Sequence, residues 1–193
     1  MRVSKAQAAE NRARILAETS RLIREGGIAG TGVDALSRAA GLTHGSLYSQ
    51  FGSKEALMAE ALTEATRRSE ETVAPNLPPG GGIAAMVERY LSPRHRDQPG
   101  SGCALAAIGA EAARQGGPVR RAFTEGMQKL AGRLRVALEG RSRAPEDEAL
   151  AAASTLVGAL ILARAVDDPD LSDRILAAAR RQLTAGEAGA NSD

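Results

Sequence analysis

The fold is decided by one stretch of the sequence, TGVDALSRAAGLTHGSLYSQFGSK, which runs from Thr31 to Lys54. Gly41 divides this stretch, because glycine adopts at little cost the left-handed conformation that ends a helix. Thr31 followed three residues later by Asp34 is the signature of a capping box at the start of a first short helix. Thr43 can cap a second one. The stretch therefore predicts a short helix, a tight turn and another short helix.

The apolar residues on both sides of the turn follow helical spacing. Val33, Leu36 and Ala40 are three or four residues apart, so they form one face of the first helix. Leu47 and Phe51 lie one turn apart on the second helix and are expected to point inward. The outward side of that helix then consists of small or polar residues, namely His44, Gly45, Tyr48 and Ser49. A short helix of this kind fits the major groove of DNA.

Composition favours helices along the whole chain of 193 residues. The chain is 43% hydrophobic but only 2% aromatic, and alanine, leucine and arginine, which supply much of the remainder, cost little in a helix interior. No run of alternating β-branched residues predicts a strand. We therefore expect an all-α protein of about nine helices, in which a three-helix helix-turn-helix domain precedes a larger helical domain.

Charge and cysteine content exclude several kinds of protein. The formal net charge is +2, from 25 lysines and arginines against 23 acids, so any DNA binding must rely on local placement of charge and on doubling in a dimer. Cys103 is the single cysteine, which rules out an intramolecular disulfide. The two histidines lack neighbouring acids, so we expect no metal and no cofactor. The absence of an apolar signal region, and of any apolar run near 18 residues, predicts a soluble, cytoplasmic protein.

Glycine and proline divide the chain. Gly26 and Gly27 end a first helix at 6–25, and Ser53 can cap a helix that continues to about 72. Prolines and glycines at 75–82 then break the chain. The predicted division is a helix-turn-helix domain at 6–52, a connecting helix at 53–74, a second helical domain at 80–186 and a disordered tail at 187–193.

The second domain is expected to contain five helices. Pro145 opens the fourth of them, whose core at 149–166 is apolar nearly all round and should be buried on more than one side. The expected ranges are 83–91, 104–114, 118–138, 149–166 and 170–183, with a Pro- and Gly-rich loop at 92–102.

Residues 8–62 carry a combination of short motifs. They are Arg14-Ile15-Leu16, Gly26-Gly27, Thr31-Gly32-Val33, Ala39-Ala40-Gly41-Leu42, Leu47-Tyr48, Phe51 and Ser53-Lys54-Glu55-Ala56-Leu57. In this combination the segment resembles the N-terminal part of the TetR family of bacterial transcriptional regulators. Beyond Leu62 the resemblance is carried by helix order and by the segment Gly-Cys-Ala-Leu at 102–105. The resemblance implies that the first three helices bind DNA and that 80–186 is an effector-binding and dimerisation domain.

The resemblance also implies roles for single residues. Lys54 in the first turn of a helix opposes the helix dipole, which a phosphate partner would explain, and Gly45 would allow close approach of the backbone to DNA. Lys54 could instead be a solvated lysine, Tyr48 a cover for the core and Thr43 only a cap. The implied base-facing residues are Thr43, His44, Gly45 and Ser46, and the implied phosphate contacts are Thr31, Tyr48 and Lys54, with Ser49 beside them.

The second short helix is the recognition helix that the resemblance implies. It contains no arginine or asparagine that could form a bidentate pair with guanine or adenine. His44 could read a base edge or only be hydrated there. Direct readout is therefore expected to be thin, with DNA shape and water contributing to specificity.

A homodimer is implied because one short helix covers only half of a DNA site. The predicted interface consists of the last two long helices, 149–166 and 170–183. Their small residues at 151–154 and Gly158 permit close helix approach, and Ile161 and Leu162 add apolar area. The alternative is that both helices belong to the core of one chain.

An effector pocket is expected between the middle helices, and each of its candidate residues could equally be plain core. The scarcity of aromatic residues favours a small or aliphatic effector. The candidates are Met86, Tyr90, Cys103, Ile108, Glu111, Phe123 and Met127.

Cys103 supports a separate hypothesis. It lies at an expected helix start, close in sequence to Arg94, His95 and Arg96, and both a helix N-terminus and nearby cations lower the pKa of a thiol. The thiol could then sense electrophiles or oxidants. The alternative is a small buried residue with no chemical role.

The leading functional hypothesis is a transcriptional repressor that a small-molecule effector releases from its operator. A thiol-based repressor acting through Cys103 is the alternative, and a helical scaffold or an enzyme is a remote one. No nucleophile elbow, phosphate loop, metal cluster or acid-base pair is present in the sequence, so no catalytic residue is expected. The sequence leaves activation in place of repression open.

Overall fold

The computed structural model describes residues 4–41, 43–73, 82–138 and 144–185. Within these ranges the chain forms α-helices and one 3-10 helix, and no strand. The all-α expectation is confirmed. The disordered tail expected at 187–193 and the chain break expected from about 75 fall largely outside the described residues.

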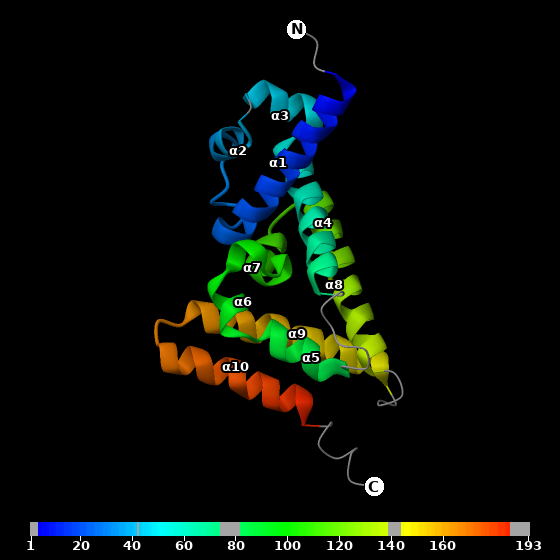
Figure 1. Ribbon diagram of the computed structural model, residues 1–193, viewed down its shortest axis with the longest axis vertical. Coiled ribbons are helices and arrows are strands. Elements are labelled where there is room, and N and C mark those ends of the chain that lie inside the picture. The colour runs from blue at the N-terminus through cyan, green and yellow to red at the C-terminus, as the bar shows by residue number, and fades with distance from the viewer. Residues whose placement is uncertain (1–3, 42, 74–81, 139–143, 186–193) are drawn as a thin grey trace. The chain divides into compact units, whose positions relative to one another are not determined.

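Figure 1 shows the order of the elements. Their bounds are α1 Lys5–Gly26, α2 Val33–Ala40, α3 His44–Phe51, α4 Lys54–Val73, α5 Gly82–Tyr90, α6 Pro93–Asp97, η2 Pro99–Ser101, α7 Ala104–Ala112, α8 Gly117–Leu138, α9 Pro145–Ala165 and α10 Pro169–Thr184.

One segment differs from the sequence-based expectation. The segment at 92–102, expected as a loop, contains α6 and the 3-10 helix η2, so the described residues hold ten α-helices rather than about nine. Ser92 caps α6 by accepting a hydrogen bond from the His95 amide at 3.2 Å, and Pro93 occupies its first position. Serine followed by proline is a helix-start signal that the richness of this segment in proline and glycine concealed.

The chain divides into two compact units. The first comprises Met1–Ser69 and Cys103–Gly126, and the second comprises Glu70–Gly102 and Met127–Asp193. The first unit therefore joins α7 and the start of α8 to the N-terminal helices, an association that the predicted division at 52 and 80 does not contain.

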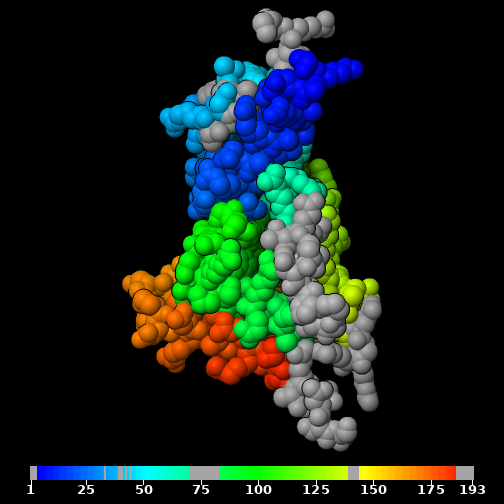
Figure 2. Space-filling model, viewed as in Figure 1, coloured from blue at the N-terminus to red at the C-terminus, as the bar shows by residue number. Residues whose placement is uncertain are grey.

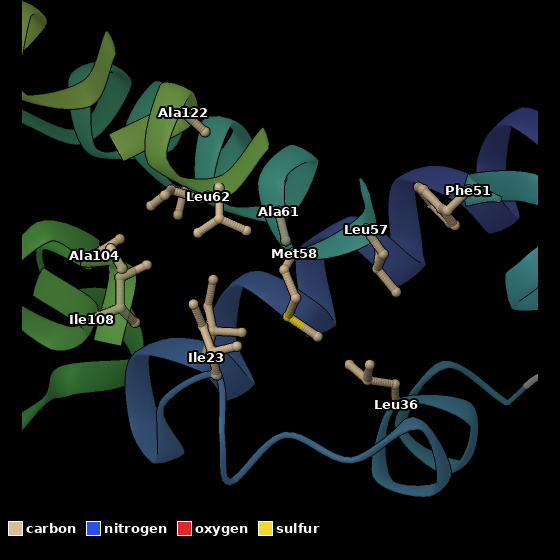
Figure 3. Packing of buried hydrophobic residues seen from close by; sticks show 14 of the residues in the cluster. Ile23, Leu36, Phe51, Leu57, Met58, Ala61, Leu62, Ala104, Ile108 and Ala122 are labelled. Atoms are coloured by element: carbon tan, nitrogen blue, oxygen red, sulfur yellow. The ribbon is translucent and has the colours of Figure 1, made fainter. Parts of the chain in front are cut away.

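One continuous apolar core holds the first unit together. The side chains of Ile23, Met58, Leu62 and Ile108 point into a common interior, as Figure 3 shows. Each is no more than 2% exposed, and burying a side chain of this size contributes roughly 1.5–3 kcal/mol. Because Ile108 comes from α7, the core of the helix-turn-helix region is completed by a helix that lies far away in the sequence.

In the second unit, α10 packs along both α9 and α5 (Figure 1). Leu156 and Leu160 of α9 and Leu176 of α10 are at most 1% exposed. Among the described residues the opposite side of α9 is exposed, since Leu150 and Leu162 are 51% and 56% exposed. The chain itself buries one side of this helix, and the expectation that it is buried on more than one side stays a prediction for its other side.

The helix α9 is also notable for its length and apolar composition. Its best window has a mean hydropathy of 1.5, which makes α9 long and apolar enough to cross a membrane by length and composition alone. The sequence-based expectation missed this run. Because 39% of that window is buried within the chain, and core helices of soluble proteins meet the same criteria, the run is weak support for a membrane span.

Glu64 on α4 provides a pH-dependent contribution to stability. Its carboxylate accepts hydrogen bonds from Arg67 at 2.8 Å and Arg68 at 2.7 Å, and these, Arg67 first, lower the pKa of Glu64 to about 2 from its ordinary 4.5. A carboxyl whose pKa is depressed in the folded state stabilises above its unfolded pKa, and the contribution is lost as pH falls from 4.5 to about 2.

We predict that Glu64→Gln lowers the free energy of unfolding by about 0.5–1 kcal/mol at pH 7. The value is discounted because the side chains of both arginines are nearly half exposed to solvent. The difference from the wild type should vanish near pH 2. Urea unfolding at a series of pH values measures it, with the exposed Glu125→Gln as control. A difference that stays constant with pH would contradict the assignment.

Candidate nucleic-acid interface

The turn between α2 and α3 has the geometry that the sequence predicts. Gly41 ends α2 in the left-handed conformation, with φ 64° and ψ 36°. Thr43 caps α3, since its hydroxyl oxygen accepts a hydrogen bond from the Ser46 amide at 3.3 Å. Leu47 and Phe51 are 3% and 7% exposed and anchor α3 in the core. The predictions for these residues as turn, cap and anchors are confirmed.

A contact among three helices fixes the far end of α3. The guanidinium of Arg12, on α1, lies 4.6 Å from the centroid of the Phe51 ring and forms an ion pair with Glu60 of α4. A cation over an aromatic face at this distance is attractive by roughly 0.5–1 kcal/mol at an exposed site. The C-terminal end of α3 is thus fixed against α1 and α4.

The outward face of α3 is polar and uncovered by the first unit. Tyr48 is 48% exposed, Gly45 and Ser49 are exposed, and the Ser49 hydroxyl donates to the Ser46 carbonyl at 3.0 Å. A Cβ added at Gly45 would meet nothing within 4 Å, so packing within the chain does not require a glycine there. His44 is the first residue of the helix, but its side chain lies outside the described residues.

The predicted capping box at Thr31 was wrong. The N-cap of α2 is Gly32, which offers no side chain, and Thr31 precedes it. Thr31 is 2% exposed, and its hydroxyl donates to the Gly27 carbonyl at 2.6 Å. The hydroxyl therefore closes the turn before α2 in place of capping the helix, and a phosphate contact by Thr31 stays a prediction.

Two cations lie in and beside this motif. Lys54, half-buried, is the first residue of α4, directly after Ser53, whose hydroxyl caps the helix by accepting from the Ala56 amide at 3.0 Å. Arg38 is exposed in the last turn of α2 and was not singled out from the sequence. The signal for it was present, because an arginine in the last turn of the first short helix precedes the recognition helix by only six residues.

The seven effector-pocket candidates are divided between the two units. Ile108 is core, at 1% exposed, and the Glu111 carboxylate accepts a hydrogen bond from the Ala29 amide. Tyr90 meets His95 edge to face, with ring centroids 4.7 Å apart. The pocket stays a prediction. The first unit holds Cys103, Ile108, Glu111 and Phe123, and the second holds Met86, Tyr90 and Met127.

The cations near Cys103 in sequence have other partners. Arg96 pairs with Asp97 at 2.7 Å and with Asp173 at 2.6 Å, and these acids, Asp97 first, raise its pKa. His95 Nδ1 lies 2.6 Å from the Tyr90 carbonyl oxygen, and burial lowers the pKa of this histidine. Cys103 itself is the partly buried N-cap residue of α7.

No group of three or more His, Cys, Asp or Glu side chains that could hold a metal ion occurs among the described residues.

Comparison with known proteins finds a family that matches the segment containing α2 and α3. Residues 15–61 match the family described as bacterial regulatory proteins, tetR family. The N-terminal domain belongs to the TetR family. The match covers α2, α3 and much of α1 and α4, so the helix-turn-helix of this chain is the DNA-binding motif of a TetR-type transcriptional regulator.

Solved structures extend the likeness to the whole fold. The reduced form of NemR from E. coli is 26% identical, with a TM-score of 0.78 over 91% of this chain and 96% of that chain. TetR-family regulators from Cytophaga hutchinsonii and Chloroflexus aurantiacus are each 22% identical, with TM-scores of 0.77 and 0.78. They cover 96% and 95% of this chain and 98% and 97% of their own. No curated protein sequence matches the chain.

Proposed function

We propose that the protein is a homodimeric, sequence-specific repressor that a small-molecule effector releases from its operator. The proposal that the protein binds DNA rests on one observation, that α3 has one buried side and one exposed polar side. Leu47 and Phe51 fix one side of this helix in the core, while Gly45, Tyr48 and Ser49 form an exposed polar face. A short helix held in this way can enter the major groove without rearranging.

An uncovered apolar face on the second unit supports the dimer. Leu150, Ser154 and Ile161 of α9 are four and seven residues apart and therefore share one side of the helix, and Leu162 adjoins Ile161. All four are exposed. Leu171 on α10 is 38% exposed. Figure 2 shows the C-terminal end of α9 and α10 at the surface, in orange and red. Exposed apolar patches mark interaction sites, and the same face of a second copy would bury these side chains.

The proposed dimer reads DNA with two copies of α3, set roughly 34–36 Å apart over two half-sites. Thr43, His44, Gly45 and Ser46 would face the bases, and Tyr48 and Lys54 would contact phosphate. Because strong base-reading side chains are few, shape and water carry part of the specificity. A cytoplasmic, non-enzymatic protein fits this role.

Release requires an effector that prefers the DNA-incompetent state. The effector can shift the equilibrium only by the difference between its affinities for the two states, and by linkage DNA weakens effector binding by the same factor.

A mobility-shift assay with the DNA upstream of the protein's own gene tests the proposal. We expect a sequence-selective shift that weakens steeply as salt rises, because phosphate contacts release counterions. Reporter transcription that falls on expression of the protein identifies repression. The absence of a selective shift at any nearby promoter would remove the regulator proposal.

A second candidate is a thiol-based release mechanism through Cys103. Cys103 is the partly buried N-cap residue of α7, and Arg24 of α1 belongs to the same compact unit. The NemR structure, which is 26% identical to this chain, is described as a reduced form. This description supports a test of whether oxidation state also matters for this chain. Both a helix N-terminus and a nearby cation favour the thiolate.

The Cys103→Ser variant decides between the two release mechanisms. If the thiol senses electrophiles, the variant binds DNA as the wild type does, but a thiol-modifying electrophile no longer releases it. Mobility shifts with and without the electrophile measure this. Unchanged release of the variant would dispose of the thiol mechanism and leave reversible effector binding.

A further inference from the structure

We propose that Glu111 is a positioning residue for DNA binding, which fixes the turn between α1 and α2 and so orients the helix-turn-helix. The inference rests on the proposed DNA binding and adds to it a residue of α7, a helix that the comparison with the family at 15–61 does not include.

The first observation is a hydrogen bond across 82 positions of sequence. The Glu111 carboxylate oxygen Oε2 accepts a hydrogen bond from the Ala29 amide at 2.8 Å. Ala29 lies in the turn between α1 and α2. A charged acceptor makes this bond stronger than one between neutral groups.

The second observation is the shape of the turn beneath the carboxylate. Gly27 has φ +72°, and a Cβ at this position would lie 2.0 Å from Glu111 Oε1. A side chain there would be strained by the backbone and would also displace the carboxylate. Gly27 in turn offers its carbonyl to the buried hydroxyl of Thr31 at 2.6 Å. Glu111, Gly27 and Thr31 thus form one contact series that ends directly before α2.

The third observation explains why Glu111 stays in place. Ile108 and Ala112 of the same helix are 1% and 2% exposed and belong to the core formed with Ile23 and Leu62 (Figure 3). Ile108 lies one turn before Glu111, so both face α1. The apolar contacts fix α7 against α1. The Glu111 carboxylate, carried by this fixed helix, then holds the Ala29 amide and so fixes the turn.

The sign of the expected effect separates this role from simple electrostatics. Removing an acid from a protein that binds DNA ordinarily strengthens binding or leaves it unchanged. If Glu111 positions the turn, Glu111→Ala instead weakens specific binding by about tenfold, the scale of one charge-assisted hydrogen bond. Glu111→Gln keeps an acceptor oxygen and should stay within about threefold of the wild type.

The experiment uses the full chain and a DNA fragment selected by the wild type from a random library. Glu125→Ala is the matched control, because Glu125 is an exposed acid of α8 in the same compact unit and its removal changes the charge equally. Binding is measured by fluorescence anisotropy. Affinity of Glu111→Ala equal to or above that of Glu125→Ala would overturn the proposal, as would failure of Glu111→Gln to restore binding.

Hydrogen exchange of the free protein tests the contact without DNA. We expect the amides at 27–31 to exchange about tenfold faster in Glu111→Ala than in Glu125→Ala, with unchanged exchange in the buried part of α4. Equal exchange at 27–31 would overturn the proposal even if DNA binding changed. A wild type that selects no DNA would refute the proposed function, while the exchange result would still decide whether Glu111 holds the turn.

Discussion

We expect Leu162→Glu to convert the proposed dimer to a monomer at micromolar concentration and to lower its affinity for a selected DNA site by at least about 100-fold. Leu162 is 56% exposed on the apolar face of α9. In the proposed dimer this face is buried, so each copy would bring an unpaired carboxylate out of water at a cost of several kcal/mol. A monomer can occupy only one half-site, which removes the gain from binding two linked sites.

Sedimentation equilibrium gives the oligomeric state, and fluorescence anisotropy gives the DNA affinity of the same samples. Val136→Glu is a matched control, since Val136 is 58% exposed on α8 and the change introduces the same charge. We expect this control to remain dimeric and to bind DNA. A dimeric Leu162→Glu variant with unchanged affinity would show that the α9 face is not the interface.

The double variant Tyr48→Ala, Lys54→Ala should weaken DNA binding by about 100-fold at moderate salt, because each dimer would lose four phosphate contacts. Lys54 opens α4 directly after the Ser53 cap, and Tyr48 is 48% exposed on α3. The slope of log affinity against log salt should fall by about two per dimer through Lys54, while the preferred DNA sequence stays the same.

Titrations at several salt concentrations measure both quantities. Lys129→Ala, which removes an exposed lysine from α8, is the control for loss of charge alone and should leave the salt slope nearly unchanged. A double variant with the wild-type salt slope would contradict the assignment of Lys54 to phosphate.

The sequence predicted those parts of the interface that depend on neighbouring residues. Gly41, Thr43 and Ser53 act within three or four positions of themselves, as a left-handed end and as caps. Thr31 was misassigned because a threonine hydroxyl can donate to a preceding carbonyl as well as accept from an amide of the following helix. Its hydroxyl donates to the Gly27 carbonyl, four residues back, and Gly32 takes the N-cap position.

Features that depend on distant packing could not be predicted. The partner of Glu111 is 82 positions away, and nothing in the sequence around 111 marks it as a contact to the turn. Which side of α9 is exposed also depends on the helices that pack against it. Leu156 and Leu162 are both leucines in the same apolar run, yet they are 0% and 56% exposed. An effector pocket would likewise depend on packing between helices that are distant in sequence, so the sequence offers only candidate residues for it.

In the proposed dimer, two copies of α3 read one DNA site together. Hydroxyl-radical footprinting of the wild type on its selected DNA tests this directly, because it maps protected sugars base by base. We expect two symmetric protected regions about one helical turn apart, roughly 34–36 Å, both lost in Leu162→Glu. A single protected region, or uniform protection without sequence preference, would contradict it.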